Sequence, residues 1–241
     1  MLLLLEAGRR IGVWRRRKNP DGADKESGAV DAAIFGLMGL LIAFTFSGAA
    51  SRFDERRHLI VQEANAIGTF YLRLDLLPAD SQGALREKMR QYVDARLAFY
   101  RKLSDQDGAE FEMERSTALQ LEIWRAAVAG SRGAGLPSVM TLVLSAANDM
   151  IDITTTRGMA LKMHPPPIIF AMLAVLVLVS SLLAGYGMAA NAKRNWLHML
   201  IFAGMMSMAV YVILDLEYPR FGLVRVDATD QVLVDLRQSF K

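Results

Sequence analysis

Three long stretches of this chain contain almost no charged side chains. They are residues 30–50, 168–190 and 196–216. A helix needs about 20 apolar residues to cross the hydrocarbon core of a bilayer, because each residue adds about 1.5 Å to its length. Each stretch is long enough, so the sequence predicts an all-α membrane protein with three transmembrane helices. The last two are joined only by residues 191–195 and should form an antiparallel hairpin.

Most of the charge lies between the first and second apolar stretches. Residues 51–164 hold 15 Lys/Arg and 15 Asp/Glu and are therefore neutral, while the whole chain has a net charge of +3. Nucleic-acid binding needs a basic stripe that faces the phosphates. This region has no such stripe, so no nucleic-acid partner is expected. The chain has no cysteine, which excludes disulfides and thiolate metal sites.

The region 51–164 has the pattern of a water-exposed helical bundle. Between Ile60 and Leu74, apolar residues recur at alternating spacings of four and three, as in a coiled-coil seam. Residues 51–77 contain no proline, so the first transmembrane helix should continue into water as one long helix. The other expected segments are helices over 81–104, 109–129 and 137–163, a flexible link over 130–135 and a C-terminal tail over 217–241.

The first 29 residues are predicted to form a basic interfacial segment. Leu2–Leu5 is apolar but too short to span a bilayer, and the basic cluster follows it, which is the reverse of a signal peptide. The segment is either an interfacial anchor with Trp14 at the headgroups or the end of a span that begins upstream. The basic cluster consists of Arg9, Arg10, Arg15, Arg16, Arg17 and Lys18.

Two neighbouring rows of side chains distinguish the first transmembrane stretch. Gly36, Leu40 and Phe44 form one row, about 100° around the helix from a row of small residues. Small residues let helices pack closely in lipid, and rings of bulky apolar residues gate pores by excluding water. The pattern suits a ring of helices around a pore; alternatively, Leu40 and Phe44 face lipid or the other two spans. The small residues are Gly39, Ala43, Ser47 and Ser51.

Two polar residues, Glu63 and Asn65, lie within the most regular part of the long predicted helix. A polar residue in such a seam can set the register and oligomeric state of packed helices. It can also face a water-filled channel, or lie on a solvated face. The sequence leaves these three interpretations open.

The sequence shows no arrangement of nucleophile, base and orienting group, so we expect neither an enzyme nor a cofactor. Asp149 and Asp152 share one helix face and could bind a hard cation through their oxygens. We expect them instead to pair with Arg73 or Arg157, and we expect no metal site.

Asp215 lies at the end of the last apolar stretch. A carboxylate is disfavoured at a helix C-terminus because the helix dipole is negative there. We therefore expect a cationic partner for Asp215, which would be Arg220, Arg52 or Arg56.

The chain resembles a family of bestrophin-like membrane proteins from bacteria and plants, over nearly its whole length from residue 30. A shorter stretch, residues 36–70, resembles the bestrophins themselves, in which an apolar pore helix precedes an arginine and an aromatic residue, as at Arg52 and Phe53. Two residues depart from that bestrophin pattern. Gly36 has no side chain that could form a ring, and Asp54 stands in place of a second aromatic residue. The motifs that carry the wider resemblance are Phe44-Thr45-Phe46-Ser47, Glu63-Ala64-Asn65-Ala66-Ile67-Gly68-Thr69 and Leu214-Asp215-Leu216-Glu217-Tyr218-Pro219-Arg220.

The bestrophin resemblance implies a pentameric anion channel whose neck is lined at the positions of Leu40, Phe44 and Gly36. Arg52 and Arg56 would lie at the pore mouth and raise the local concentration of anions. The expected partners are then the lipid bilayer, further copies of the chain and small inorganic ions. The alternative function is a non-conducting membrane scaffold or sensor whose helical domain binds partners.

The location predicted for such a chain is the bacterial inner membrane. Nine Lys/Arg lie on the side of the membrane where the first span begins. Seven precede Val30, and the other two are Lys193 and Arg194 in the link between the last two spans. The positive-inside rule places that side in the cytoplasm and the helical domain outside it. The bestrophin resemblance implies the opposite orientation. We favour the charge rule because the bestrophin resemblance is local.

Overall fold

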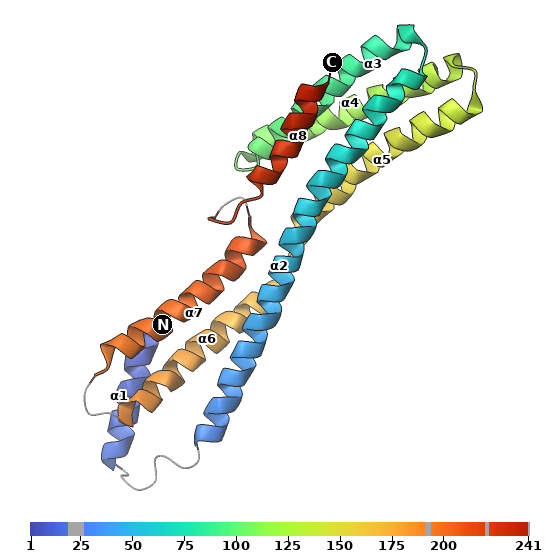
Figure 1. Cartoon of the computed structure of the whole chain (residues 1–241). Coiled ribbons are helices and arrows are strands. Elements are labelled where there is room, and N and C mark those ends of the chain that lie inside the picture. Colours follow the sequence, from blue (N-terminus) through green and yellow to red (C-terminus); the bar gives the residue numbers. More distant parts are fainter. Residues whose placement is uncertain (19–26, 191–193, 220–221, 241) are drawn as a thin grey trace. The chain divides into compact units, whose positions relative to one another are not determined.

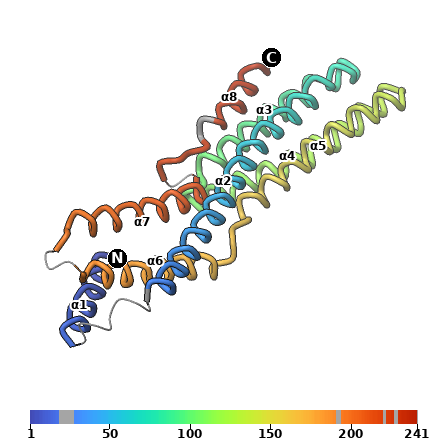
Figure 2. Tube along the Cα trace, turned by 60° about the horizontal axis from the view of Figure 1, so that its bottom comes forward, coloured from blue at the N-terminus to red at the C-terminus, as the bar shows by residue number. Residues whose placement is uncertain are grey.

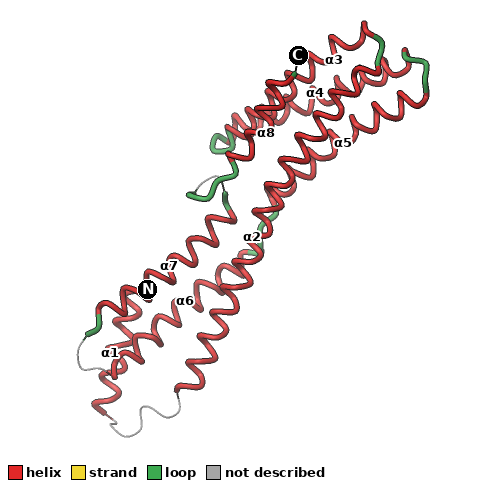
Figure 3. Tube along the Cα trace, viewed as in Figure 1, coloured by secondary structure: helices red, strands yellow, loops and turns green. Residues whose placement is uncertain are grey.

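The computed structural model of the chain describes residues 1–18, 27–190, 194–219 and 222–240. Within these ranges all regular secondary structure is helical and no strand occurs (Figure 3). This confirms the predicted all-α fold. The chain forms two units, residues 1–53 with 164–224 (unit 1) and residues 54–163 with 225–241 (unit 2), and each is described by itself.

Figure 1 shows the helices and labels them in chain order. Two short 3-10 helices, η1 and η2, follow α2 and α6. The elements are α1 (Leu2–Lys18), α2 (Ser27–Arg73), η1 (Leu74–Leu76), α3 (Ala79–Arg101), α4 (Gln106–Gly133), α5 (Pro137–Lys162), α6 (Pro167–Gly187), η2 (Met188–Ala190), α7 (Trp196–Glu217) and α8 (Asp227–Ser239).

Helix α2 is the longest element, with 47 residues and no break (Figure 2). This confirms that the first span continues as one long helix. Three segments of the described chain are long and apolar enough to cross a membrane, in agreement with the three predicted transmembrane helices. They lie within Gly28–Leu76, Pro137–Ala190 and Trp196–Glu217.

Unit 1 holds the apolar helices. One side of α2 packs against α6 and α7 through an apolar cluster, because these helices carry large apolar side chains at matching positions. The buried members of this cluster are Met38, Ala49, Leu173, Val177 and Ile213.

The N-terminal residues form helix α1, which approaches α6 very closely. A Cβ atom on Gly8 would lie 1.9 Å from the carbonyl oxygen of Leu182, and one on Gly185 would lie 2.0 Å from that of Leu5. Glycine is needed where two helix backbones come this near. The sequence left open how residues 1–18 relate to the spans, and the structure packs them along α6 as a helix of 17 residues.

Unit 2 is a bundle formed by the second part of α2 with α3, α4, α5 and α8. Its core contains large, fully buried side chains from all five of these helices, among them Phe70, Met89, Ile123, Met150 and Leu233. The seam predicted on α2 contributes to this core through Ala64 and Ile67, and Ile60 is buried as well.

Two segments of unit 2 differ from the sequence-based prediction. Helix α4 continues to Gly133 and so extends into the stretch 130–135, for which the sequence predicts a flexible link. Gly130 packs beside Leu77 and Ser81, where a Cβ would come within 3.3 Å of each side chain. This tertiary contact favours a residue without a side chain, which is a physical reason for glycine inside the helix.

Helix α8 lies within the segment that was assigned to a C-terminal tail. Leu233 is fully buried in the bundle, and the ring of Phe240, which follows α8, stacks on Tyr71 with 3.8 Å between ring centroids. Arg237 forms an ion pair with Asp94 of α3 at 2.8 Å. A helix of 13 residues is only marginally stable alone in water, so these contacts explain why the segment is helical.

Candidate functional site

One side of α2 remains open within unit 1. Leu40 and Phe44 are 52% and 67% exposed, and Gly36 lies one turn before Leu40 on the same side. A Cβ atom added to Gly36 or Gly39 would meet no other atom within 4 Å. Ala43 and Ser47 are exposed as well. The two rows noticed in the sequence therefore lie side by side on the open side of α2.

The packed side of α2 lies opposite. Met38 and Ala49 are buried there against α6 and α7. Leu40 and Phe44 therefore point away from the other two spans, which removes one of the interpretations left open by the sequence.

The open side changes character along α2. Successive residues of an α-helix are rotated by about 100°, so the residues within about 60° of Leu40 can be identified from their numbers. After the apolar stretch they include Ser47 and Ser51, and then two carboxylates, Asp54 and Glu55. In unit 2 the exposed residues that meet the same criterion are mostly polar; they are His58, Val61, Gln62, Asn65, Thr69 and Leu72.

Arg52, expected at a pore mouth, lies on the other side of α2 and is engaged within unit 1. Its Nε and Nη2 atoms donate to Glu217 Oε2 at 2.9 and 2.7 Å. The Nδ1 atom of His164 lies 2.8 Å from the other oxygen of Glu217, and its ring stacks on Tyr218. Glu217 is fully buried, so two cationic or hydrogen-bonding groups compensate the cost of burying its charge.

Arg56 is also held away from the open side. Its side chain is buried and donates to the carbonyl oxygens of Ala160 and Met163, at 3.2 and 3.1 Å. These carbonyls lie at the C-terminal end of α5, where the helix dipole favours a cation. Arg56 therefore stabilises the end of α5 within unit 2.

The expected pairing of Asp215 is corrected by the structure. Arg52 binds Glu217, two residues further on, while Asp215 Oδ2 accepts backbone hydrogen bonds from Leu223 and Val224, at 3.1 and 2.9 Å. The chain turns back after α7 and brings two N–H donors to the carboxylate, which takes the place of a cation. The third candidate partner, Arg220, lies outside the described residues.

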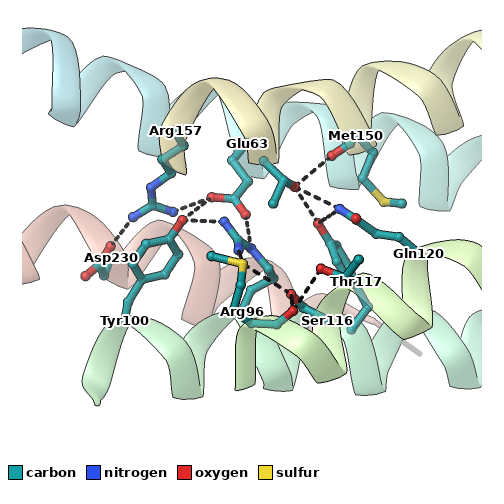
Figure 4. A network of polar contacts seen from close by, with 12 residues as sticks. Glu63, Arg96, Tyr100, Ser116, Thr117, Gln120, Met150, Arg157 and Asp230 are labelled. Atoms are coloured by element: carbon teal, nitrogen blue, oxygen red, sulfur yellow. Dashed lines mark hydrogen bonds and ion pairs between the residues drawn. The ribbon is translucent and has the colours of Figure 1, made fainter. Parts of the chain in front are cut away.

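Glu63 lies on the packed side of α2, in the centre of unit 2 (Figure 4). It is fully buried between two arginines: Arg96 donates from Nε at 2.6 Å, and Arg157 binds the other carboxylate oxygen. Arg157 also reaches Asp230 of α8 at 2.8 Å, and Tyr100 contacts both Arg96 and Glu63. Through Arg96 and Arg157, the carboxylate of Glu63 thus links α2 to α3 and α5, and Arg157 extends the network to α8.

The charged groups of this network shift the pKa values of their neighbours. Burial alone would lower the pKa of Arg96, but the Glu63 carboxylate beside it raises that pKa above its ordinary value. Burial and the charge of Glu63 both raise the pKa of the Tyr100 hydroxyl, which stays protonated and able to donate. A neighbouring hydrogen-bonded group joins Tyr92, Thr154 and Gln120, at 2.9 to 3.2 Å.

The two polar residues of the predicted seam thus lie on different sides of α2. Glu63 is buried in the bundle, which rules out the solvated face for it, whereas Asn65 is exposed on the side of Leu40. The sequence did not reveal that Arg96 and Arg157 would meet Glu63. They lie 33 and 94 residues away from it, beyond the reach of any local spacing rule.

The expected pairing of Asp149 and Asp152 is wrong. Arg157 binds Glu63 and Asp230, and Arg73 donates to the carbonyl oxygen of Leu142. Asp152 accepts a hydrogen bond from Asn148 at 2.7 Å, and both aspartates are exposed. Within the described ranges, no three His, Cys, Asp or Glu side chains lie close enough to hold a metal ion.

Comparison with solved structures finds the same fold in bacterial proteins. Two crystal structures of a bacterial bestrophin homologue from Klebsiella pneumoniae, each with a point mutation, match with TM-scores of 0.72 and 0.71 at 14% and 15% identity. The first match covers 98% of this chain and 97% of that chain, and the second covers 99% and 98%. A structure of the homologue obtained by Zn-SAD phasing has a TM-score of 0.69 at 15% identity, covering 98% and 97%.

Comparison with curated proteins gave no match. The sequence model described as "Bestrophin-like domain" matches residues 13–230, which is most of the chain. The match includes α2 with its open side, Glu217 with its partners Arg52 and His164, and the buried network around Glu63. The protein is therefore a membrane protein that belongs to the Bestrophin-like family.

Proposed function

We propose that this chain assembles with copies of itself into an ion channel whose pore is lined by the open side of α2. The observation that carries the proposal is the order of side chains on that side: apolar at Leu40 and Phe44, then carboxylate at Asp54 and Glu55. The opposite side of the same helix is packed. Membership of the Bestrophin-like family supports this assignment.

Leu40 and Phe44 form the constriction in this proposal. An ion that enters a narrow apolar ring loses part of its hydration, and no group of the wall replaces it. Gly36 has no side chain and leaves the pore wider one turn before Leu40. Arg52 and Arg56 do not line the pore in this proposal. They hold α2 in place, because Arg52 binds Glu217 of α7 and Arg56 binds the carbonyl oxygen of Ala160 in α5.

The small residues Gly39, Ala43 and Ser47 face neighbouring copies in the assembly, which is a pentamer if it follows the bestrophins. Ala43→Leu should block close approach of the helices and shift the protein towards monomers, because a leucine does not fit where backbones nearly touch. Mass measurement in detergent by light scattering checks this. Ala174→Leu, the same change at an exposed position of α6, is the matched control; equal loss of assembly in both variants contradicts the proposed interface.

The charges on the open side of α2 bear on which ions pass. The bestrophin resemblance implies anions, attracted by Arg52 and Arg56. In the structure these arginines lie away from the side of Leu40, whereas Asp54 and Glu55 lie on it and are exposed. A pore mouth lined by carboxylates raises the local concentration of cations. We therefore propose that the channel prefers cations.

The reversal potential in a planar bilayer with a KCl gradient tests both conduction and ion preference. We expect wild-type protein to conduct and to favour K⁺. Asp54→Asn with Glu55→Gln should lower the K⁺/Cl⁻ permeability ratio by about tenfold, since it removes two carboxylates from each copy. Asp149→Asn with Asp152→Asn removes the same charge from exposed positions on α5 and should leave the ratio unchanged. A wild-type preference for Cl⁻ contradicts the cation assignment.

The alternative is a non-conducting scaffold or sensor. It predicts no current from any of these variants, and a monomer or dimer in detergent instead of a ring. For the orientation, the excess of Lys/Arg near the start of α2 leads us to propose that unit 2 lies outside the cytoplasm.

A further inference from the structure

Six basic side chains gather on helix α1, in a part of the molecule that the proposed pore does not use. The acidic residue of α1 is Glu6, which binds Arg10 at 2.9 Å and Arg194 at 2.7 Å. Such an excess of positive charge beside apolar helices attracts anionic groups. The basic residues are Arg9, Arg10, Arg15, Arg16, Arg17 and Lys18.

Some of these side chains line a pocket. Arg9, Arg10, Arg17, Val13 and Trp14 surround a shallow volume of about 190 Å³ with no acidic residue in its lining. The Nε atom of Arg9 is buried and has no hydrogen-bond partner among the described residues. The pocket thus combines three guanidinium groups with an apolar side.

The pocket is held in place along α6. A Cβ on Gly8 would meet the backbone of Leu182, and one on Gly12 would meet Ala189. The turn of α1 that follows Gly12 therefore lies level with the end of α6, where the apolar stretch 168–190 ends. Trp14 is 59% exposed there. Exposed tryptophans favour the boundary between lipid tails and headgroups.

We propose that this pocket binds the phosphate group of an anionic phospholipid, with the acyl chains of the lipid lying along the apolar side of α1. Guanidinium groups form paired, charge-assisted hydrogen bonds with phosphate oxygens. Val13 and Trp14 offer the apolar surface next to them. This inference does not depend on ion conduction.

Basic residues also suit the C-terminal end of any helix, because the dipole is negative there. That role depends on charge near the end and not on which side of the helix carries it. The lipid site depends on the side, since Arg17 lines the pocket and Arg15 does not. The two arginines therefore form a matched pair for a test.

Native mass spectrometry of the full chain in mild detergent measures binding of dioleoyl phosphatidylglycerol, dioleoyl phosphatidylcholine and inorganic phosphate. We expect wild-type protein to bind phosphatidylglycerol about tenfold more tightly than phosphatidylcholine. Arg17→Gln should weaken phosphatidylglycerol binding by about tenfold, as expected for one lost charge-assisted contact, and Arg15→Gln by less than about twofold. Arg9→Gln should act like Arg17→Gln.

Three results would overturn the lipid site. They are equal binding of the two lipids, equal losses from Arg15→Gln and Arg17→Gln, and displacement of phosphatidylglycerol by millimolar inorganic phosphate. The last would assign the pocket to a free anion. Gel filtration of each variant verifies that it is folded, and unchanged current in the bilayer separates this proposal from that of the pore.

Discussion

Replacing Glu63 with glutamine is expected to lower the melting temperature of the protein by about 6–20 °C. The change leaves Arg96 and Arg157 facing a neutral amide in the core of unit 2, where both arginines are buried. Removing one partner from a buried ion pair costs about 3–5 kcal/mol. For a chain of this size each kcal/mol corresponds to about 2–4 °C. Thermal unfolding in detergent, followed by circular dichroism, measures the shift.

Glu122→Gln is the matched control for Glu63→Gln. Glu122 also pairs with a basic side chain, Lys88, but its own side chain is 51% exposed. Exposed ion pairs contribute about 0–1 kcal/mol, so the control should shift the melting temperature by a few degrees at most. Similar shifts in the two variants would show that the network around Glu63 contributes no more than a surface pair.

Replacing both Leu40 and Phe44 with alanine is expected to raise ion flux through the assembled protein by about tenfold or more. Two smaller side chains in each copy widen the apolar ring, so that an ion keeps more of its hydration. A tenfold increase corresponds to a barrier lowered by about 1.4 kcal/mol. Flux is measured with an ion-sensitive dye in liposomes of fixed protein content.

Phe46→Ala serves as the control for Phe44→Ala. Both side chains are exposed in the single chain, at 46% and 67%, but two residues of an α-helix differ by about 200° in direction. The control should leave flux unchanged. Increased flux in Phe46→Ala, without an increase in Phe44→Ala, would place the pore on a different side of α2.

The sequence alone determined the elements whose signals are local. Three apolar stretches of sufficient length predict three spans, and the lack of proline after residue 50 predicts that α2 continues into unit 2. The small row at Gly39, Ala43 and Ser47 and the bulky row at Leu40 and Phe44 follow from helical periodicity. These features depend on residues close to one another in the chain, so that composition and spacing are enough to recognise them.

The tertiary structure decided which charges meet. Arg52 binds Glu217, 165 residues away, and not Asp215, because the turn after α7 supplies backbone donors to Asp215. Glu63 turned out to be buried, since Arg96 and Arg157 arrive from α3 and α5. Helix α8 likewise depends on the bundle against which it packs. Pairings of this kind depend on how helices pack, and many different pairings of the same charges are compatible with one sequence pattern.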